Sequence, residues 1–143
     1  MYYFKTYCTL PDEAKFIRET VFVKEQGFVK EFDEKDTFAM HIVLYSSENK
    51  PIAACRYFPD KDGMFYIVGR IAVLKEFRHK SYGAVMLREA ERQIKNTGAL
   101  EIRLAAQARA KGFYEKSGYS VMGKEFLEEY CPHIWMRKIW RQN

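Results

Sequence analysis

The sequence has 143 residues, of which 48% are hydrophobic and 16% aromatic against 30% charged. This length fits a single domain spanning 1–143, and the composition supplies an apolar core that needs no metal or cross-link, which excludes a disordered chain. The net charge of +5 is spread along the chain without a long basic block, which argues against a dedicated nucleic-acid binder.

The apolar pattern of the first half predicts one helix followed by a β-meander. A helix is expected near 11–24, where a proline and two acidic residues precede an apolar face and Gly27 ends it. The short apolar runs 41–45 and 52–58 flank a turn-forming stretch and predict a hairpin. A long buried strand is then expected within 64–74.

The second half predicts a helix and a further set of strands. After Gly83, apolar residues recur every three or four positions as far as Gly98, which indicates a helix. The remaining elements are expected to be a strand, a short helix and two strands: 101–106, 108–116, 118–122 and 133–140. The resulting order, α-β-β-β-α-β-α-β-β, indicates a mixed α/β (α+β) domain with a strand–loop–helix–strand unit at its centre.

Two features of the sequence bear on assembly and location. Trp135 and Trp140 lie five residues apart in the last expected strand, so one is expected in the core and the other at a sheet edge or a homodimer contact. Cys8, Cys55 and Cys131 are odd in number and far apart, which predicts neither a disulfide framework nor a zinc site. Because no apolar run could span a membrane and no signal peptide is recognisable, we expect a cytoplasmic protein without membrane attachment.

The segment between the long strand and the next helix has the layout of an anion-binding turn. N–H groups in the first turn of a helix lack intrahelical partners, and small residues there let a phosphate approach the backbone. The segment reads Arg78, His79, Lys80, Ser81, Tyr82, Gly83 and Ala84. Neither a P-loop nor a Rossmann fingerprint is present, which disfavours nucleoside triphosphates and NAD, and no metal-binding pattern occurs.

These segments resemble motifs of a known family. The strand 70–73 (RIAV) and the loop 78–84 (RHKSYGA) resemble the coenzyme A motif of the GNAT superfamily of acetyltransferases, R/Q-x-x-G-x-G/A. Downstream, 110–119 (AKGFYEKSGY) resembles a later helix of that family. Four further places resemble a subgroup of small bacterial acetyltransferases, so the resemblance covers about the whole chain: 21–26, 31–36, His41 and 132–136.

One departure from the motif concerns the backbone of the loop. Ser81 stands where the first glycine of the motif is expected, and His79 stands where glycine is common. Ser81 can still offer its N–H to a phosphate. A requirement for positive φ at that position would weaken the binding of coenzyme A.

The resemblance implies a GNAT fold: a mixed, mostly antiparallel sheet of about six to seven strands flanked by helices, with a central β-loop-α-β unit that binds acetyl-CoA. It implies transfer of an acetyl group from acetyl-CoA to a primary amine of a small molecule or peptide by direct attack, and we expect neither a metal nor a nucleic-acid partner. Backbone groups of Ile71, Ala72 and Val73 would pair with the pantetheine arm. The runner-up hypothesis is a GNAT-fold module that binds coenzyme A as a sensor or scaffold.

Several side chains are candidates for the chemistry, each with a structural alternative. By the resemblance, Tyr114 is the general acid that protonates the leaving thiolate, although it could merely pack its helix on the sheet. Glu25, His41 and His133 are the candidate bases. Alternatively, Glu25 is a solvated carboxylate and the two histidines have structural roles. Gln107 could donate to the pantetheine or cap the helix beside it.

The chain also carries an acidic stretch between the first helix and the hairpin. Its carboxylates are Glu31, Asp33, Glu34 and Asp36. They could attract a cationic amine, or they could form a solvated loop, as charge runs usually do.

Overall fold

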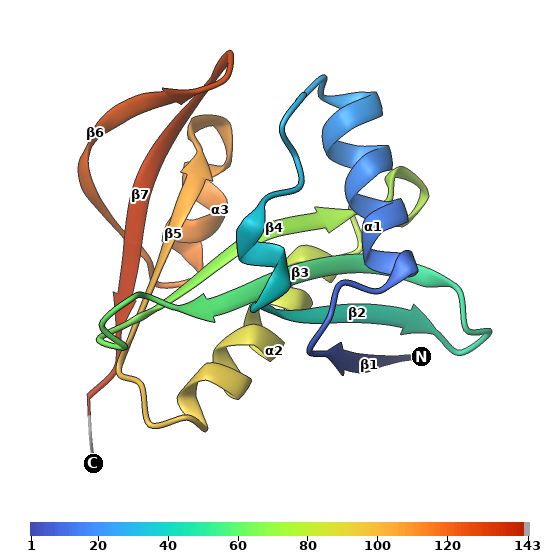
Figure 1. Ribbon diagram of the computed structural model, residues 1–143, viewed down its shortest axis with the longest axis horizontal. Coiled ribbons are helices and arrows are strands. Elements are labelled where there is room, and N and C mark those ends of the chain that lie inside the picture. Colours follow the sequence, from blue (N-terminus) through green and yellow to red (C-terminus); the bar gives the residue numbers. More distant parts are fainter. Residues whose placement is uncertain (142–143) are drawn as a thin grey trace. The chain divides into compact units, whose positions relative to one another are not determined.

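In the computed structural model, residues 1–141 are described, and the chain divides into two compact units. The first unit comprises Met1–Phe58 and Val68–Gln93, and the second comprises the remaining segments. Seven strands follow one another in the order β1-β2-β3-β4-β5-β7-β6, and β4 contributes to both units (Figure 1). The β4–β5 pairing is parallel, whereas β1–β2, β2–β3, β5–β7 and β6–β7 are antiparallel. A mixed, mostly antiparallel sheet flanked by helices was expected and is confirmed.

The first unit holds the hairpin and the two longer helices. Its elements are β1 (Tyr2–Tyr7), α1 (Asp12–Arg18), η1 (Glu19–Glu25), η2 (Glu34–Thr37), β2 (Met40–Ser46), β3 (Pro51–Pro59), most of β4 (Tyr66–Val73), η3 (Lys75–Phe77) and most of α2 (Tyr82–Lys95). The predicted hairpin, the strand within 64–74 and the following helix are therefore confirmed, although only Val68 and Ala72 of that strand are buried. Strand β1 was not predicted, although aromatic residues favour strands and the stretch is rich in them.

Strand β3 is buried along almost its whole length because both of its faces are covered. Tyr57 donates a hydrogen bond to Gln93 of α2 at 2.8 Å. Arg56, the preceding residue, donates to Asp36 of η2 at 2.8 Å. Neighbouring residues of a strand point to opposite faces, so α2 covers one face of β3 and the segment containing η2 covers the other.

The first helix changes its hydrogen-bonding pattern halfway along. α1 ends at Arg18 and continues directly as η1, a π-helical segment in which the Gln26 N–H donates to the Val21 carbonyl at 3.1 Å. Gly27, with φ 82°, then ends the helix. A helix near 11–24 stopping at this glycine is confirmed, and the wider turn is an addition. Such π-helical segments are rare and are frequent at functional sites.

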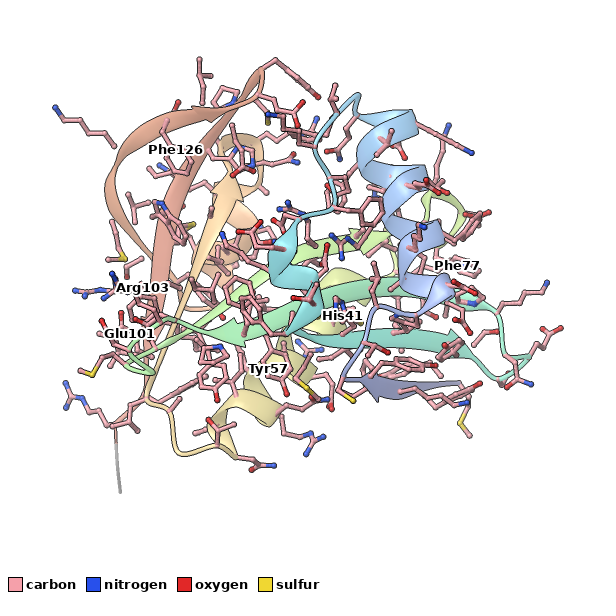
Figure 2. The ribbon with its side chains drawn as sticks, in the orientation of Figure 1. His41, Tyr57, Phe77, Glu101, Arg103 and Phe126 are labelled. Atoms are coloured by element: carbon pink, nitrogen blue, oxygen red, sulfur yellow. The ribbon has the colours of Figure 1, made fainter. Side chains whose placement is uncertain are left out.

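The second unit is built around the last three strands. Its elements are the start of β4, β5 (Glu101–Gln107), η4 (Ala108–Ala110), α3 (Lys111–Lys116), β6 (Ser120–Glu128) and β7 (Cys131–Ile139). β7 pairs with both β5 and β6, and the buried side chains of β5 alternate along the strand, as expected for a sheet with one face on a core. The guanidinium carbon of Arg103 on β5 lies 3.8 Å from the centroid of the Phe65 ring, and Arg103 forms an ion pair with Glu101. Figure 2 labels Arg103 and Glu101.

The expectation that one of the two tryptophans lies in the core is wrong, and the homodimer contact stays a prediction. Trp140 follows β7 and is half-buried, with Lys95 over its ring, and Trp135 is 37% exposed. Trp135 stacks on Phe126 of β6 at 6.3 Å between ring centroids. Neither side chain is a core residue. The prediction assumed that side chains alternate between the two faces of one strand from Trp135 to Trp140, but β7 ends at Ile139.

Leu87→Ala is expected to test the core under α2. Leu87 is 1% exposed, and removing three buried methyl or methylene carbons there should lower the free energy of unfolding by about 2 to 5 kcal/mol. Arg88→Ala is the matched control, since this neighbouring side chain is exposed and its loss should change stability by less than about 0.5 kcal/mol. Urea denaturation of both variants measures the difference, and equal midpoints would contradict the assigned helix face.

Candidate active site

The loop between β4 and α2 contains two non-glycine residues with a left-handed backbone. His79 and Ser81 both have φ 64°, in the left-handed region that favours glycine. The Ser81 carbonyl accepts the first helical hydrogen bond, from the Val85 N–H at 3.1 Å, so α2 begins directly after Ser81. Ser81 and His79, which stand where the family motif often has glycine, therefore both have a positive φ. This conformation costs a non-glycine residue about 1 to 2 kcal/mol.

This geometry turns the start of α2 into a place for an anion. The N–H groups of Tyr82, Gly83 and Ala84 belong to the first helical turn, where no carbonyl lies four residues earlier within the helix. The dipole of this 14-residue helix adds partial positive charge at the same end. His79, Lys80 and Ser81 are exposed, and a diphosphate could reach the loop from solvent. The loop residues therefore fit the coenzyme A diphosphate that the sequence suggested.

Arg78 joins the loop to two other elements. Its Nε donates to the Val73 carbonyl at 3.0 Å, at the end of β4. Its two terminal nitrogens donate to the carboxylate of Glu25, at 2.5 and 2.8 Å, at the end of η1. Donation of these hydrogen bonds to Glu25 raises the pKa of Arg78 above its ordinary value. The structure thus brings together two predicted site residues, and the charge of Arg78 is paired with Glu25.

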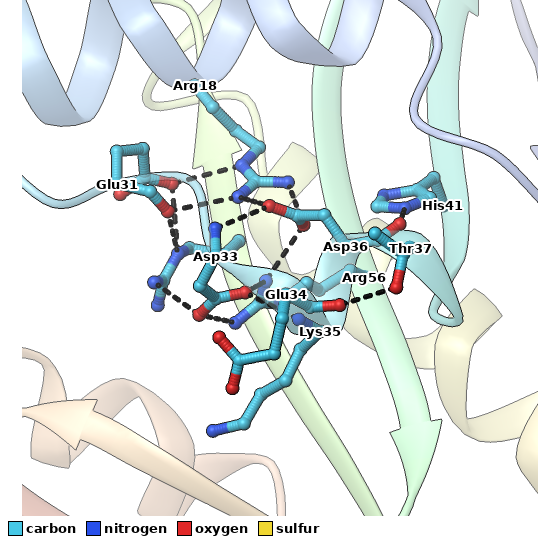
Figure 3. Close-up of polar contacts among 10 residues, drawn as sticks. Arg18, Glu31, Asp33, Glu34, Lys35, Asp36, Thr37, His41 and Arg56 are labelled. Atoms are coloured by element: carbon cyan, nitrogen blue, oxygen red, sulfur yellow. Dashed lines mark hydrogen bonds and ion pairs between the residues drawn. The ribbon is translucent and has the colours of Figure 1, made fainter.

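The two candidate histidines are buried. His41 is 1% exposed on β2, and its Nε2 lies 3.0 Å from the Asp36 carbonyl (Figure 3). Burial lowers the pKa of His41, although the Asp36 carbonyl opposes the shift. His133 is 4% exposed on β7, with its Nδ1 2.9 Å from the Cys131 carbonyl. These positions favour the structural alternative for both.

Tyr114 and Gln107 belong to the second unit. Tyr114 is half-buried on α3, and its ring meets Phe113 and Tyr119 edge-on, at 5.0 and 6.0 Å between centroids. Gln107 ends β5, and its side-chain oxygen accepts a hydrogen bond from Arg109 at 2.9 Å. The Tyr114 ring therefore contacts aromatic rings of its own helix and of the segment that follows it, and its role as an acid stays a prediction.

The acidic stretch forms a structure that the sequence analysis did not foresee. Its carboxylates neither line a solvated loop nor face outward, except for exposed Glu34. Three of them join three arginines in a closed circuit of alternating charge, here called the ion ring: Arg18, Glu31, Arg70, Asp33, Arg56 and Asp36 (Figure 3). Each arginine contacts two carboxylates and each carboxylate contacts two arginines.

One half of the ion ring lies in the deep interior of the first unit. Arg18, 1% exposed at the end of α1, donates to Glu31 at 3.0 Å and to Asp36 at 2.7 Å. Arg56 of β3 donates to Asp36 at 2.8 Å and to Asp33 at 2.6 Å. Both arginines are buried among apolar side chains, and a buried charge is stable only when it is paired with an opposite charge.

Arg70 closes the ion ring from β4. Its Nε lies 3.0 Å from the Glu31 carboxylate and donates to the Glu31 backbone carbonyl at 3.2 Å, while a terminal nitrogen lies 3.5 Å from Asp33. Arg70 also has φ 54°, a left-handed residue within a strand. A signal for the ring was present in the sequence, because Arg56 interrupts an apolar strand and Arg18 lies on the apolar face of a helix.

The carboxylates of the ion ring titrate in different directions. Burial alone would raise the pKa of Asp36, but hydrogen bonds from Arg18 and Arg56 hold it well below its usual range. Burial would also raise the pKa of Asp33, but the hydrogen bond and the charge of Arg56 lower it. For Glu31, burial outweighs the two arginines that it contacts and raises its pKa.

The sequence and the fold match known proteins. The chain matches the family model described as an acetyltransferase (GNAT) domain over residues 11–140. It is 40% identical over 129 residues to the uncharacterised N-acetyltransferase YjcF of Bacillus subtilis, covering 88% of this chain and 90% of that protein. A crystal structure of a candidate N-acetyltransferase from Lactobacillus plantarum is 28% identical, with a TM-score of 0.89 over 98% of this chain and 99% of that chain.

Escherichia coli ElaA, at 21% identity, shares the fold with a TM-score of 0.86 over 96% of this chain and 99% of its own. Fold and loop therefore define an acetyltransferase domain. The chain belongs to the GNAT family.

The described residues show neither a metal-binding cluster nor a membrane-spanning helix. Within residues 1–141, no group of three or more His, Cys, Asp or Glu side chains is arranged to hold a metal ion. Cys8, Cys55 and Cys131 are free thiols. In the part of the chain that the structure describes, no helix is both long and apolar enough to cross a bilayer.

Ser81→Gly is expected to stabilise the loop. Glycine adopts φ 64° without the steric cost that serine bears, and a gain of up to about 1 kcal/mol should remain after the greater freedom of glycine in the unfolded chain is subtracted. Ser81→Ala keeps the Cβ atom and removes only the hydroxyl, so it separates the backbone effect from any loss of capping. Thermal unfolding should rank glycine above alanine, and the reverse order would contradict the left-handed assignment.

Asp36→Asn is expected to lower stability and to flatten its dependence on pH in acid. Removing one charge from the ion ring leaves buried guanidinium groups uncompensated, at a cost of about 3 to 5 kcal/mol near pH 7. Because the folded pKa of Asp36 lies below its ordinary value of 3.8, its contribution is complete above about pH 4 and is lost as the pH falls through the folded pKa.

The measurement is the free energy of unfolding between about pH 7 and pH 2, a range set by the unperturbed carboxyl pKa. Asp62→Asn, in an exposed turn, is the control and should follow the wild type. An acid dependence as steep in Asp36→Asn as in the wild type would show that Asp36 is not the strongly paired group.

Proposed function

We propose that this chain transfers an acetyl group from acetyl-CoA to a primary amine of a small molecule, by direct attack of the amine on the thioester. The observation that supports this most is the left-handed backbone at His79 and Ser81, directly before the first-turn N–H groups of α2. Such groups bind phosphate oxygens. In a GNAT chain, acetyl-CoA is the substrate that brings a diphosphate to this loop.

The attacking amine must first lose a proton. With a pKa of about 10.4, this costs roughly 4 to 5 kcal/mol at pH 7 without a base. Because both candidate histidines are buried against backbone carbonyls, we favour Glu25, which is exposed. Its two oxygens accept hydrogen bonds from Arg78, and a water molecule between the amine and this carboxylate could pass the proton.

The departing sulfur needs a proton in turn. As the new N–C bond forms and the C–S bond breaks, the electron pair goes to the thiolate of coenzyme A. Tyr114 is the proposed donor, since a phenol with a pKa of about 10 stays protonated at neutral pH and can protonate a thiolate whose conjugate acid is near 8.5. The acetylated amine and free coenzyme A are the products.

The release of free thiol from acetyl-CoA, measured with a panel of primary amines, tests the proposal directly. Amine-dependent release is expected. If calorimetry shows that coenzyme A binds but no amine accelerates release, the chain is a coenzyme A-binding module instead. A chain that binds no coenzyme A would contradict both functions.

Tyr114→Phe is expected to lower turnover about 100-fold while leaving the affinity for coenzyme A nearly unchanged, because only the proton donor is lost. Tyr130→Phe removes the same hydroxyl from an exposed turn of the same unit and should keep the wild-type rate. Steady-state kinetics with saturating amine, together with calorimetric titration of coenzyme A, provides both readouts. An unaltered rate in Tyr114→Phe would remove this residue from the mechanism.

A further inference from the structure

The backbone of Arg70 has a left-handed conformation that its neighbours in the sequence do not explain. It lies inside β4 with φ 54°, whereas Gly69, the residue beside it that could adopt such a conformation freely, does not have a positive φ. A strained backbone at a long, charged residue persists only where its surroundings hold it there. The explanation must therefore come from contacts made by the Arg70 side chain.

Those contacts are made to the acidic segment of the ion ring. The Nε of Arg70 reaches both the carboxylate of Glu31, at 3.0 Å, and its backbone carbonyl, at 3.2 Å. Glu31 is itself 4% exposed and is held from its other side by Arg18 at 3.0 Å. Asp33 adds a weaker contact at 3.5 Å. Arg70 is thus fixed to a buried anchor that does not depend on β4.

The strained residue stands directly before a functionally important stretch. Ile71, Ala72 and Val73 follow it, and the backbone groups of these residues are the ones proposed to pair with the pantetheine arm. A left-handed residue in a strand changes the direction in which the next backbone groups point, as in a β-bulge, and such features are frequent beside active sites. The conformation at position 70 therefore sets which groups the stretch presents.

We infer that Arg70 is a positioning residue for acyl-CoA, held by its ion pairs with Glu31 and Asp33. The acidic segment of the ion ring controls coenzyme A binding through the backbone of β4, without touching the coenzyme. This inference rests on the proposed function, since it assigns a cause to the geometry of the same binding strand. It gives the buried charges a role in substrate binding in addition to their role in stability.

Two substitutions at one position separate the backbone from the charge. Arg70→Ala and Arg70→Gly both delete every contact of the guanidinium, but only glycine keeps the left-handed conformation without steric cost. We expect Arg70→Ala to weaken coenzyme A binding at least about 10-fold and Arg70→Gly to stay within about 3-fold of the wild type, by calorimetric titration. In steady-state kinetics, the loss in Arg70→Ala should appear in the KM for acetyl-CoA, while kcat stays within about 3-fold.

Glu31→Gln tests the anchor from the other side. It keeps the shape of the side chain and removes the charge that holds Arg70, so a loss of coenzyme A affinity of about 3- to 10-fold is expected. Glu48→Gln, in the exposed turn of the β2–β3 hairpin, is the matched control. Val43→Ala, a buried core change on β2, controls for lost stability and should leave affinity unchanged below its unfolding transition.

The outcomes separate this inference from the proposed function. Equal affinities in Arg70→Ala and Arg70→Gly would overturn it, whether both retain the wild-type value or both lose it, because the left-handed conformation would then not be the cause. The proposed function would survive that result. A wild-type chain that binds no coenzyme A would overturn the function, and the inference with it.

Discussion

Three guanidinium groups and three carboxylates meet inside the first unit, and neither set could be buried without the other. Each group contacts two of opposite sign, so the charges cancel around a closed ring. Taking charges from water is costly, and the contacts offset this cost only while each charge keeps its partners. Because the members come from α1, the segment before β2, β3 and β4, the ion ring fixes how these elements meet.

Regular elements could be predicted where their signal lies within a few consecutive residues. The β2–β3 hairpin and α2 each carry an apolar period and a turn or glycine at the end, which is why both appear near their predicted bounds. The change from α1 to η1 could not be predicted, since a shift to wider hydrogen bonding leaves no mark in the apolar pattern. Strand β1 was missed although its aromatic residues signalled it.

The candidate site, too, could be predicted only in part from the sequence. The position of the anion loop could be predicted from a strand, a short polar turn and a helix in sequence, whereas left-handed His79 and Ser81 are visible only in the structure. The ion ring joins side chains that lie between 13 and 39 residues apart. Arg56 within an apolar strand is a signal of a buried partner that the prediction did not use, and the sequence does not choose among the four carboxylates of the acidic stretch.

The stretch from Ile71 to Val73 is held by an arginine at each end. Arg70 sets its starting direction through the ion ring, and Arg78 donates to the carbonyl of Val73 while it holds Glu25. In addition, the Leu74 N–H donates to β3, so the strand ends in a fixed place. Strain at position 70 and in the loop 78–81 is thus compensated by charged contacts that lie beside the proposed binding groups and not on them. Because these contacts are intramolecular, the backbone is ordered before a substrate arrives, and binding need not supply the free energy of ordering it.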